Sequence, residues 1–115
     1  SKDLVKDLQR AVNKIILPPV IIAVASKKTP NDDFRQKEDY AASVCALHNL
    51  VLSFWDNGIG SQWTTGAITR HQETYSALNI DSTKYEIIGF VKSGYPAAVP
   101  KVSKLSVNDI SVYLD

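Results

Sequence analysis

The residues best suited to chemistry lie between positions 57 and 66, which read Asn-Gly-Ile-Gly-Ser-Gln-Trp-Thr-Thr-Gly. The segment combines flexible glycines, one large aromatic side chain and several small hydroxyl groups. Backbone amides in such a turn can direct hydrogen-bond donors at a flat heteroaromatic ligand. A purely structural turn that carries a core tryptophan fits the same residues equally well, so both interpretations stay open at this point.

Other familiar catalytic arrangements are absent from the sequence. Cys45, His48 and His71 are too few and too scattered for a zinc site of standard spacing, so no metal is expected. No nucleophile elbow, phosphate loop or complete dinucleotide fingerprint occurs, and Gly58-Ile59-Gly60 lacks the third glycine. We expect Cys45 to be a buried structural thiol, His48 to be a core or interface histidine, and His71 to be solvated.

Length and charge restrict the class of protein. A chain of 115 residues is one domain at most, which we assign to residues 1–115. The formal net charge of +1 argues against a nucleic-acid or membrane-surface protein, since binding to phosphates normally requires a basic excess. No apolar run approaches the ~18 residues of a membrane span, and no leader pattern is visible. These features predict a soluble, cytoplasmic protein.

Periodicity predicts an α+β fold. An amphipathic stripe predicts a first helix that ends at Pro18-Pro19, and β-branched runs predict two strands. The expected elements are a helix over residues 4–16, a strand over 20–25, a long helix over 37–55, a short extended piece over 61–64, a helix over 69–78, a strand over 85–91 and a helix start at Ser106.

The long helix and the small sheet both predict further partners. Apolar residues lie on several sides of the helix over 37–55, so we expect it to be buried on most sides. A two-stranded sheet is marginal in isolation. The sheet therefore requires additional strands, from a second chain or from sequence beyond these residues.

An ordered set of segments resembles the later part of the nitroreductase family. The resemblance runs from Pro19 to Lys104, in the family's order and spacing. The segments that carry it are the apolar strand 19–25, the helix from Ala41 to Leu50, Gly-Ile-Gly-Ser-Gln-Trp-Thr-Thr-Gly at 58–66, Leu-Asn-Ile at 78–80, Glu-Ile-Ile-Gly-Phe at 86–90 and Gly-Tyr-Pro at 94–96.

This resemblance implies an FMN-dependent oxidoreductase that passes electrons from NAD(P)H to nitroaromatics, quinones or similar acceptors. It also implies a homodimer with FMN at the subunit interface, where the long helix packs. Gln62, Trp63, Thr64 and Thr65 would then line the flavin. Lys104, with Lys101 as the second choice, would reach the FMN phosphate; a solvated tail is the alternative for both lysines.

The family's N-terminal phosphate-binding arginines have no match here. Arg10, Arg35 and Arg70 are isolated, and the helical context of Arg10 does not fit that role. We therefore expect a partial domain that binds FMN weakly by itself. The alternatives are a non-catalytic nitroreductase-like remnant that acts as a dimerisation or ligand-binding module, and an unrelated α+β ligand-binding domain.

Overall fold

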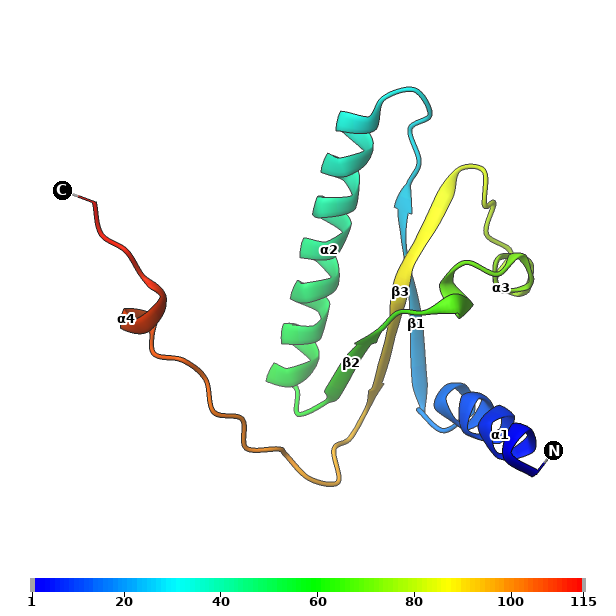
Figure 1. Cartoon of the computed structure of the whole chain (residues 1–115), viewed down its shortest axis with the longest axis horizontal. Coiled ribbons are helices and arrows are strands. Elements are labelled where there is room, and N and C mark those ends of the chain that lie inside the picture. Colours follow the sequence, from blue (N-terminus) through cyan, green and yellow to red (C-terminus); the bar gives the residue numbers. More distant parts are fainter. Residues whose placement is uncertain (1, 115) are drawn as a thin grey trace.

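The centre of the structure is an antiparallel sheet of three strands. The computed structural model describes residues 2–114, and its strands are β1 (Val20–Lys27), β2 (Gly60–Thr64) and β3 (Tyr85–Gly94), in the order β1-β3-β2 (Figure 1). The prediction of only two strands is wrong, because the short extended piece pairs with β3 from Gly60↔Gly94 to Thr64↔Phe90. Both expected strands are present, and β3 continues to Gly94.

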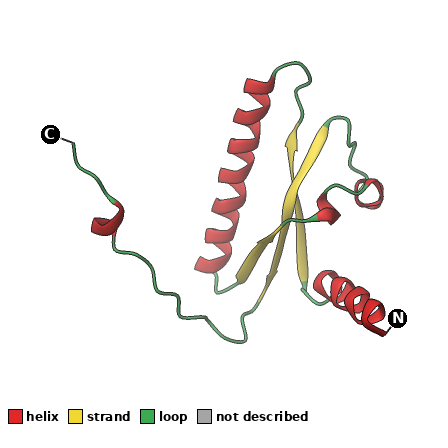
Figure 2. Ribbon diagram, in the orientation of Figure 1, coloured by secondary structure: helices red, strands yellow, loops and turns green. Residues whose placement is uncertain are grey.

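One face of the sheet is covered by the long helix α2 (Asp33–Asp56) (Figures 1 and 2). Asp32 caps the helix by accepting a hydrogen bond from the Arg35 amide at 2.9 Å, so the helix begins earlier than the apolar pattern predicts. Leu47 packs against Ile88 and Val91 to form one core cluster. Among the described residues, neither α2 nor another helix is long and apolar enough to span a membrane.

The opposite face is covered over only part of its length. The expected helix over 69–78 is divided into a 3₁₀ turn, η1 (Ala67–Thr69), and a short helix, α3 (Gln72–Ala77). The division occurs at His71, whose backbone is extended. Tyr75 of α3 packs with Ile87 and Phe90 in a second core cluster. Its Oη also accepts a buried hydrogen bond from the Ile87 N–H at 2.9 Å, which attaches α3 to the sheet.

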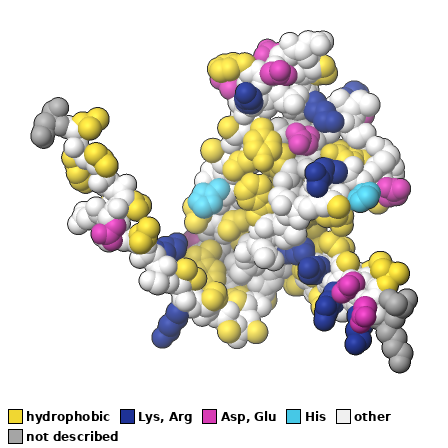
Figure 3. Space-filling view, in the orientation of Figure 1, with side chains coloured by type: hydrophobic (Ala, Val, Ile, Leu, Met, Phe, Trp, Pro, Cys, Tyr) yellow, Lys and Arg dark blue, Asp and Glu magenta, His cyan; other side chains and the backbone are white. Residues whose placement is uncertain are grey.

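The two ends of the chain leave the body of the protein. Helix α1 (Lys2–Ile16) lies beside the start of β1, and the tail after Gly94 runs away from the sheet to α4 (Val107–Ile110) (Figure 1). The radius of gyration is 17.9 Å, whereas a compact chain of this length has about 13 Å. Apolar side chains remain at the surface on the tail and on the body (Figure 3). Packing within this chain alone therefore leaves many large apolar side chains exposed.

Helix α2 is less buried than its sequence predicts. Only Leu47 is fully buried along it, because the sheet meets one side of the helix. Cys45 is exposed, so the prediction of a buried thiol is wrong for the single chain. His48 is exposed too, so the prediction of a core histidine is wrong for the single chain, and its place at an interface stays a prediction. His71 is exposed, as predicted.

The attachment of α3 can be tested with Tyr75→Phe. Removing the hydroxyl leaves the buried Ile87 amide without an acceptor, which should lower the free energy of unfolding by about 1–3 kcal/mol. Chemical denaturation of the purified chain measures this loss. Tyr85→Phe is the matched control because Tyr85 is 44% exposed. Equal stability of Y75F and Y85F would contradict the role of the hydrogen bond.

Candidate functional site

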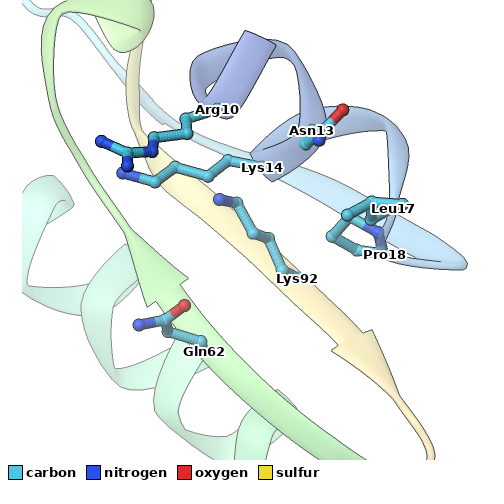
Figure 4. Close-up of a pocket in the computed structure, with 7 residues that line it drawn as sticks. All are labelled: Arg10, Asn13, Lys14, Leu17, Pro18, Gln62 and Lys92. Atoms are coloured by element: carbon cyan, nitrogen blue, oxygen red, sulfur yellow. The ribbon is translucent and has the colours of Figure 1, made fainter. Parts of the chain in front are cut away.

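Gln62 on the edge strand β2 lies at the wall of a large hollow. It is paired with Lys92 of β3, so the two side chains stand on the same face of the sheet. The hollow has a volume of about 570 Å³ and lies between this face and α1 (Figure 4). Its lining residues are Arg10, Asn13, Lys14, Leu17, Pro18, Gln62 and Lys92.

A second hollow continues from the first along the end of the sheet. The two share Pro18, Gln62 and Lys92, and the second has a volume of about 400 Å³. Its other lining residues are Pro19, Gly60, Ser61, Ser93, Gly94, Tyr95 and Pro96. The glycine-rich entry to β2 therefore borders a continuous concave surface.

Trp63 points to the other side of β2. It lies opposite Val91, and its Nε1–H donates to the Ile88 carbonyl oxygen at 3.3 Å. The indole passes so close to Gly89 that a Cβ there would overlap with Nε1. Trp63 is 41% exposed, so it is not a core tryptophan. In this chain Trp63 holds β2 against β3 through this hydrogen bond. Gln62, the preceding residue, lies on the opposite face and lines the hollow.

Thr64 and Thr65 complete the segment and differ in their surroundings. The Thr64 Oγ1 atom is buried, and no hydrogen-bond partner for it exists among residues 2–114. Thr64 lines neither hollow that contains Gln62, so this oxygen is not open to a ligand bound there. Thr65 is exposed and precedes Gly66, whose φ of 137° directs the chain into η1. Of residues 62–65, Gln62 alone lines the two hollows, so the structure does not bring the four predicted residues together on that surface.

Lys101 and Lys104 are not brought to this surface. Both are exposed in the extended tail, and neither lines the two hollows that contain Gln62. The cations that do line the larger hollow are Arg10, Lys14 and Lys92. The spacing of Arg10 and Lys14, one helical turn apart, is the signal that the sequence offers for this group. That Lys92 belongs to the same group of cations can be recognised only from the pairing of β2 with β3.

Other ionisable groups lie outside this surface. No cluster of three or more His, Cys, Asp or Glu that could hold a metal occurs within the described part of the chain. The pKa of Asp81 is lowered from its usual value, first by the hydrogen bond from the Thr83 hydroxyl and then by the Thr83 amide. Asp81 lies in the exposed turn before β3, so it orders that turn and takes no part in the site.

The packing of Trp63 over Gly89 can be tested with Gly89→Ala. The added methyl group displaces the indole, and overpacking of this kind costs about 1–3 kcal/mol. We expect lower stability in denaturant unfolding and altered tryptophan fluorescence. Gly89→Ala in a Trp63→Phe background is the control, since the smaller ring gives the methyl room. An equal penalty in both backgrounds would show that the contact does not matter.

The nitroreductase family model matches residues 7–95 of this chain. A curated protein of Bacillus subtilis (strain 168) named "Putative NAD(P)H nitroreductase YfhC" is 31% identical over 98 residues, which is 84% of this chain and 49% of that protein. A solved structure described as a nitroreductase-like family protein from Bacillus cereus superposes with a TM-score of 0.79 at 19% identity, over 99% of this chain and 60% of the other. The chain thus spans about half the length of its curated relative. The length of the family match, with the shared fold, shows that this α+β chain belongs to the nitroreductase family and carries part of the domain.

Proposed function

We propose that the chain is the flavin-bordering part of an FMN-dependent oxidoreductase that takes electrons from NAD(P)H and passes them to nitroaromatic, quinone or related acceptors. The observation that supports this most directly is the family match over residues 7–95, within which Gln62 borders a hollow. The name of the B. subtilis relative includes NAD(P)H, which is the electron donor of the proposed reaction. The redox chemistry belongs to FMN when it is bound, so the absence of an acid–base pair in the sequence is no obstacle.

The residues of this chain would orient and surround the cofactor. The Gln62 amide can both donate and accept hydrogen bonds. Thr65 lies at the exposed turn into Gly66, where backbone groups are accessible. Trp63 would maintain this geometry through its hydrogen bond to the Ile88 carbonyl.

Lys104 and Lys101 are proposed to contact the FMN phosphate once the tail folds against a complete site. They lie in a segment without helix or strand before α4, so the tail can change direction at little cost in lost structure. Arginine binds phosphate bidentately and lysine does not. A chain that offers two tail lysines for this phosphate should therefore bind FMN weakly by itself, in the micromolar range or above.

Charge reversal at the tail tests the phosphate contact. Lys104→Glu should weaken FMN binding by about tenfold or more, because a charge-assisted contact to phosphate contributes about 1.5–3 kcal/mol. Isothermal titration of the purified chain with FMN measures the change, and Lys101→Glu should show the smaller effect. Riboflavin, which lacks the phosphate, is the control and should bind K104E and the unaltered chain equally.

An unchanged affinity of K104E for FMN would show that the tail is only solvated. An assay with NAD(P)H and a quinone then tests turnover by the same preparation. Sub-micromolar FMN affinity with normal turnover would contradict weak binding by this chain. Complete absence of flavin binding would favour a non-catalytic module of the same family.

Helix α2 supports a further part of the proposal, which is assembly as a homodimer. Its solvent side carries five exposed residues at alternating steps of four and three: Ala41, Cys45, His48, Leu52 and Trp55. This spacing is typical of a seam between two helices. Leu52 and Trp55 are each 52% exposed, so the seam contains large apolar groups that a second copy could cover. An exposed apolar patch of this kind marks an interface.

Sedimentation velocity tests this seam. The unaltered chain should form a dimer at micromolar concentration, and Leu52→Glu should shift it to monomer because two charges would be buried at the interface. Leu8→Glu is the matched control, since Leu8 of α1 is similarly exposed at 57%. A monomer before substitution would contradict the proposal. Equal dissociation of L8E and L52E would place the interface elsewhere.

A further inference from the structure

We propose that the hollow between α1 and the sheet is a phosphate-binding site, separate from the tail lysines. Its identity as a phosphate site rests on its own geometry. The choice of ligand rests on the proposed function, in which FMN and NADPH each carry a phosphate monoester. We call this hollow the α1 cleft, defined by Arg10, Asn13, Lys14, Gln62 and Lys92, with Leu17 and Pro18 as its apolar end.

Three cations converge on the α1 cleft from two elements. Arg10 and Lys14 lie one turn apart on α1, so they project from the same side of the helix. Figure 4 shows both side chains extending over the sheet, towards the side on which Lys92 and Gln62 stand. No acidic residue of the described chain lines the hollow. Such an arrangement produces a positive potential over an open hollow.

Lys92 is the most informative of the three cations. It lies in β3, the central strand, with Ile21 paired on one side and Gln62 on the other, and it is partly buried. Lysine is mostly exposed in folded proteins, and a buried lysine is normally paired. Neither Lys92 nor Lys14 forms an ion pair within residues 2–114. A partly buried cation beside two others lacks a counterion, and a bound anion would supply it.

Asp7 offsets this charge only slightly. Its Oδ1 lies 3.4 Å from Arg10 Nη1, and both side chains are largely exposed at 69% and 76%. Exposed pairs of this kind contribute little and exchange readily. Arg10 is therefore available to a ligand that offers better geometry, and the cleft retains an excess of positive charge.

The lining has the donors that a phosphate requires. A phosphate dianion accepts bidentate hydrogen bonds from an arginine fork and point contacts from lysines. The Gln62 and Asn13 amides can add hydrogen bonds at the edge, although Asn13 Oδ1 already accepts from Gln9 at 2.9 Å. The volume of about 570 Å³ suits one small molecule. The net charge of +1 argues against a polyanion such as nucleic acid.

The experiment titrates the purified full chain with four ligands and inorganic phosphate. FMN is compared with riboflavin, and NADPH with NADH, so that each pair differs by one phosphate group. Lys14→Gln and Lys92→Gln remove charge from the cleft. Lys6→Gln is the matched control, since Lys6 lies on α1 but does not line the hollow. Lys14 lies on an exposed helix, so K14Q keeps the test valid even if K92Q does not fold.

We expect inorganic phosphate and one phosphorylated ligand to bind about tenfold more weakly to K14Q and K92Q than to K6Q. A loss confined to FMN identifies the flavin phosphate as the ligand and assigns it to the cleft in place of Lys104, and a loss confined to NADPH identifies the electron donor. Unchanged phosphate binding in K14Q, or no phosphate binding by the unaltered chain, overturns the inference. If FMN binding depends on Lys104 but not on Lys14, the proposed function is supported and the phosphate site in the α1 cleft is rejected. If NADPH and phosphate bind in a way that depends on Lys14 but no flavin binds, the proposed function is contradicted and the phosphate site is supported.

Discussion

The antiparallel pairing of β3 with β1 on one side and with β2 on the other is the constraint on which the rest of the structure depends. Both core clusters are built on β3, with Ile88 and Val91 under α2, and Ile87 and Phe90 under α3. The same pairing sets which side chains share a face. It places Gln62 beside Lys92 and turns Trp63 away, so the candidate site is a direct consequence of strand register.

Most elements can be predicted from the sequence because their signals are local. The stripe of α1, the β-branched run of β1 and the apolar run of β3 follow from periodicity alone. The pairing of β2 is not predicted, because its residues, Gly-Ser-Gln-Trp-Thr, have little β-branched content. It is a strand because Trp63 packs across Gly89 and hydrogen-bonds to the Ile88 carbonyl. That hydrogen bond joins residues 25 positions apart, a separation that no local sequence pattern covers.

The candidate site is predictable only in part, for the same reason. Residues 62–65 are contiguous, so their composition and the family resemblance are enough to select them. Arg10 and Lys14 share one side of a helix, but that spacing gives no sign of what lies opposite them. The fold determines this by placing α1 against the face that carries Lys92. Conversely, Lys101 and Lys104 are near one another in sequence, yet neither lines the hollows that contain Gln62, and the tail after Gly94 runs away from the sheet (Figure 1).

The limited core connects ligand binding to the stability of the chain. Six hydrophobic residues of the described chain are buried, and the largest helix has one side on the sheet and the other exposed. A fold with so small a core is marginal, because the entropy lost on ordering the chain offsets most of the gain from burial. A ligand or partner that binds only the folded state adds its binding free energy to that small margin. Occupation of the α1 cleft would do so locally, since a bound anion would join α1, which has little contact with the sheet otherwise, to the central strand through Lys92. Ligand binding at the charged cleft and association through the exposed seam of α2 would therefore each be coupled to the folding of this chain.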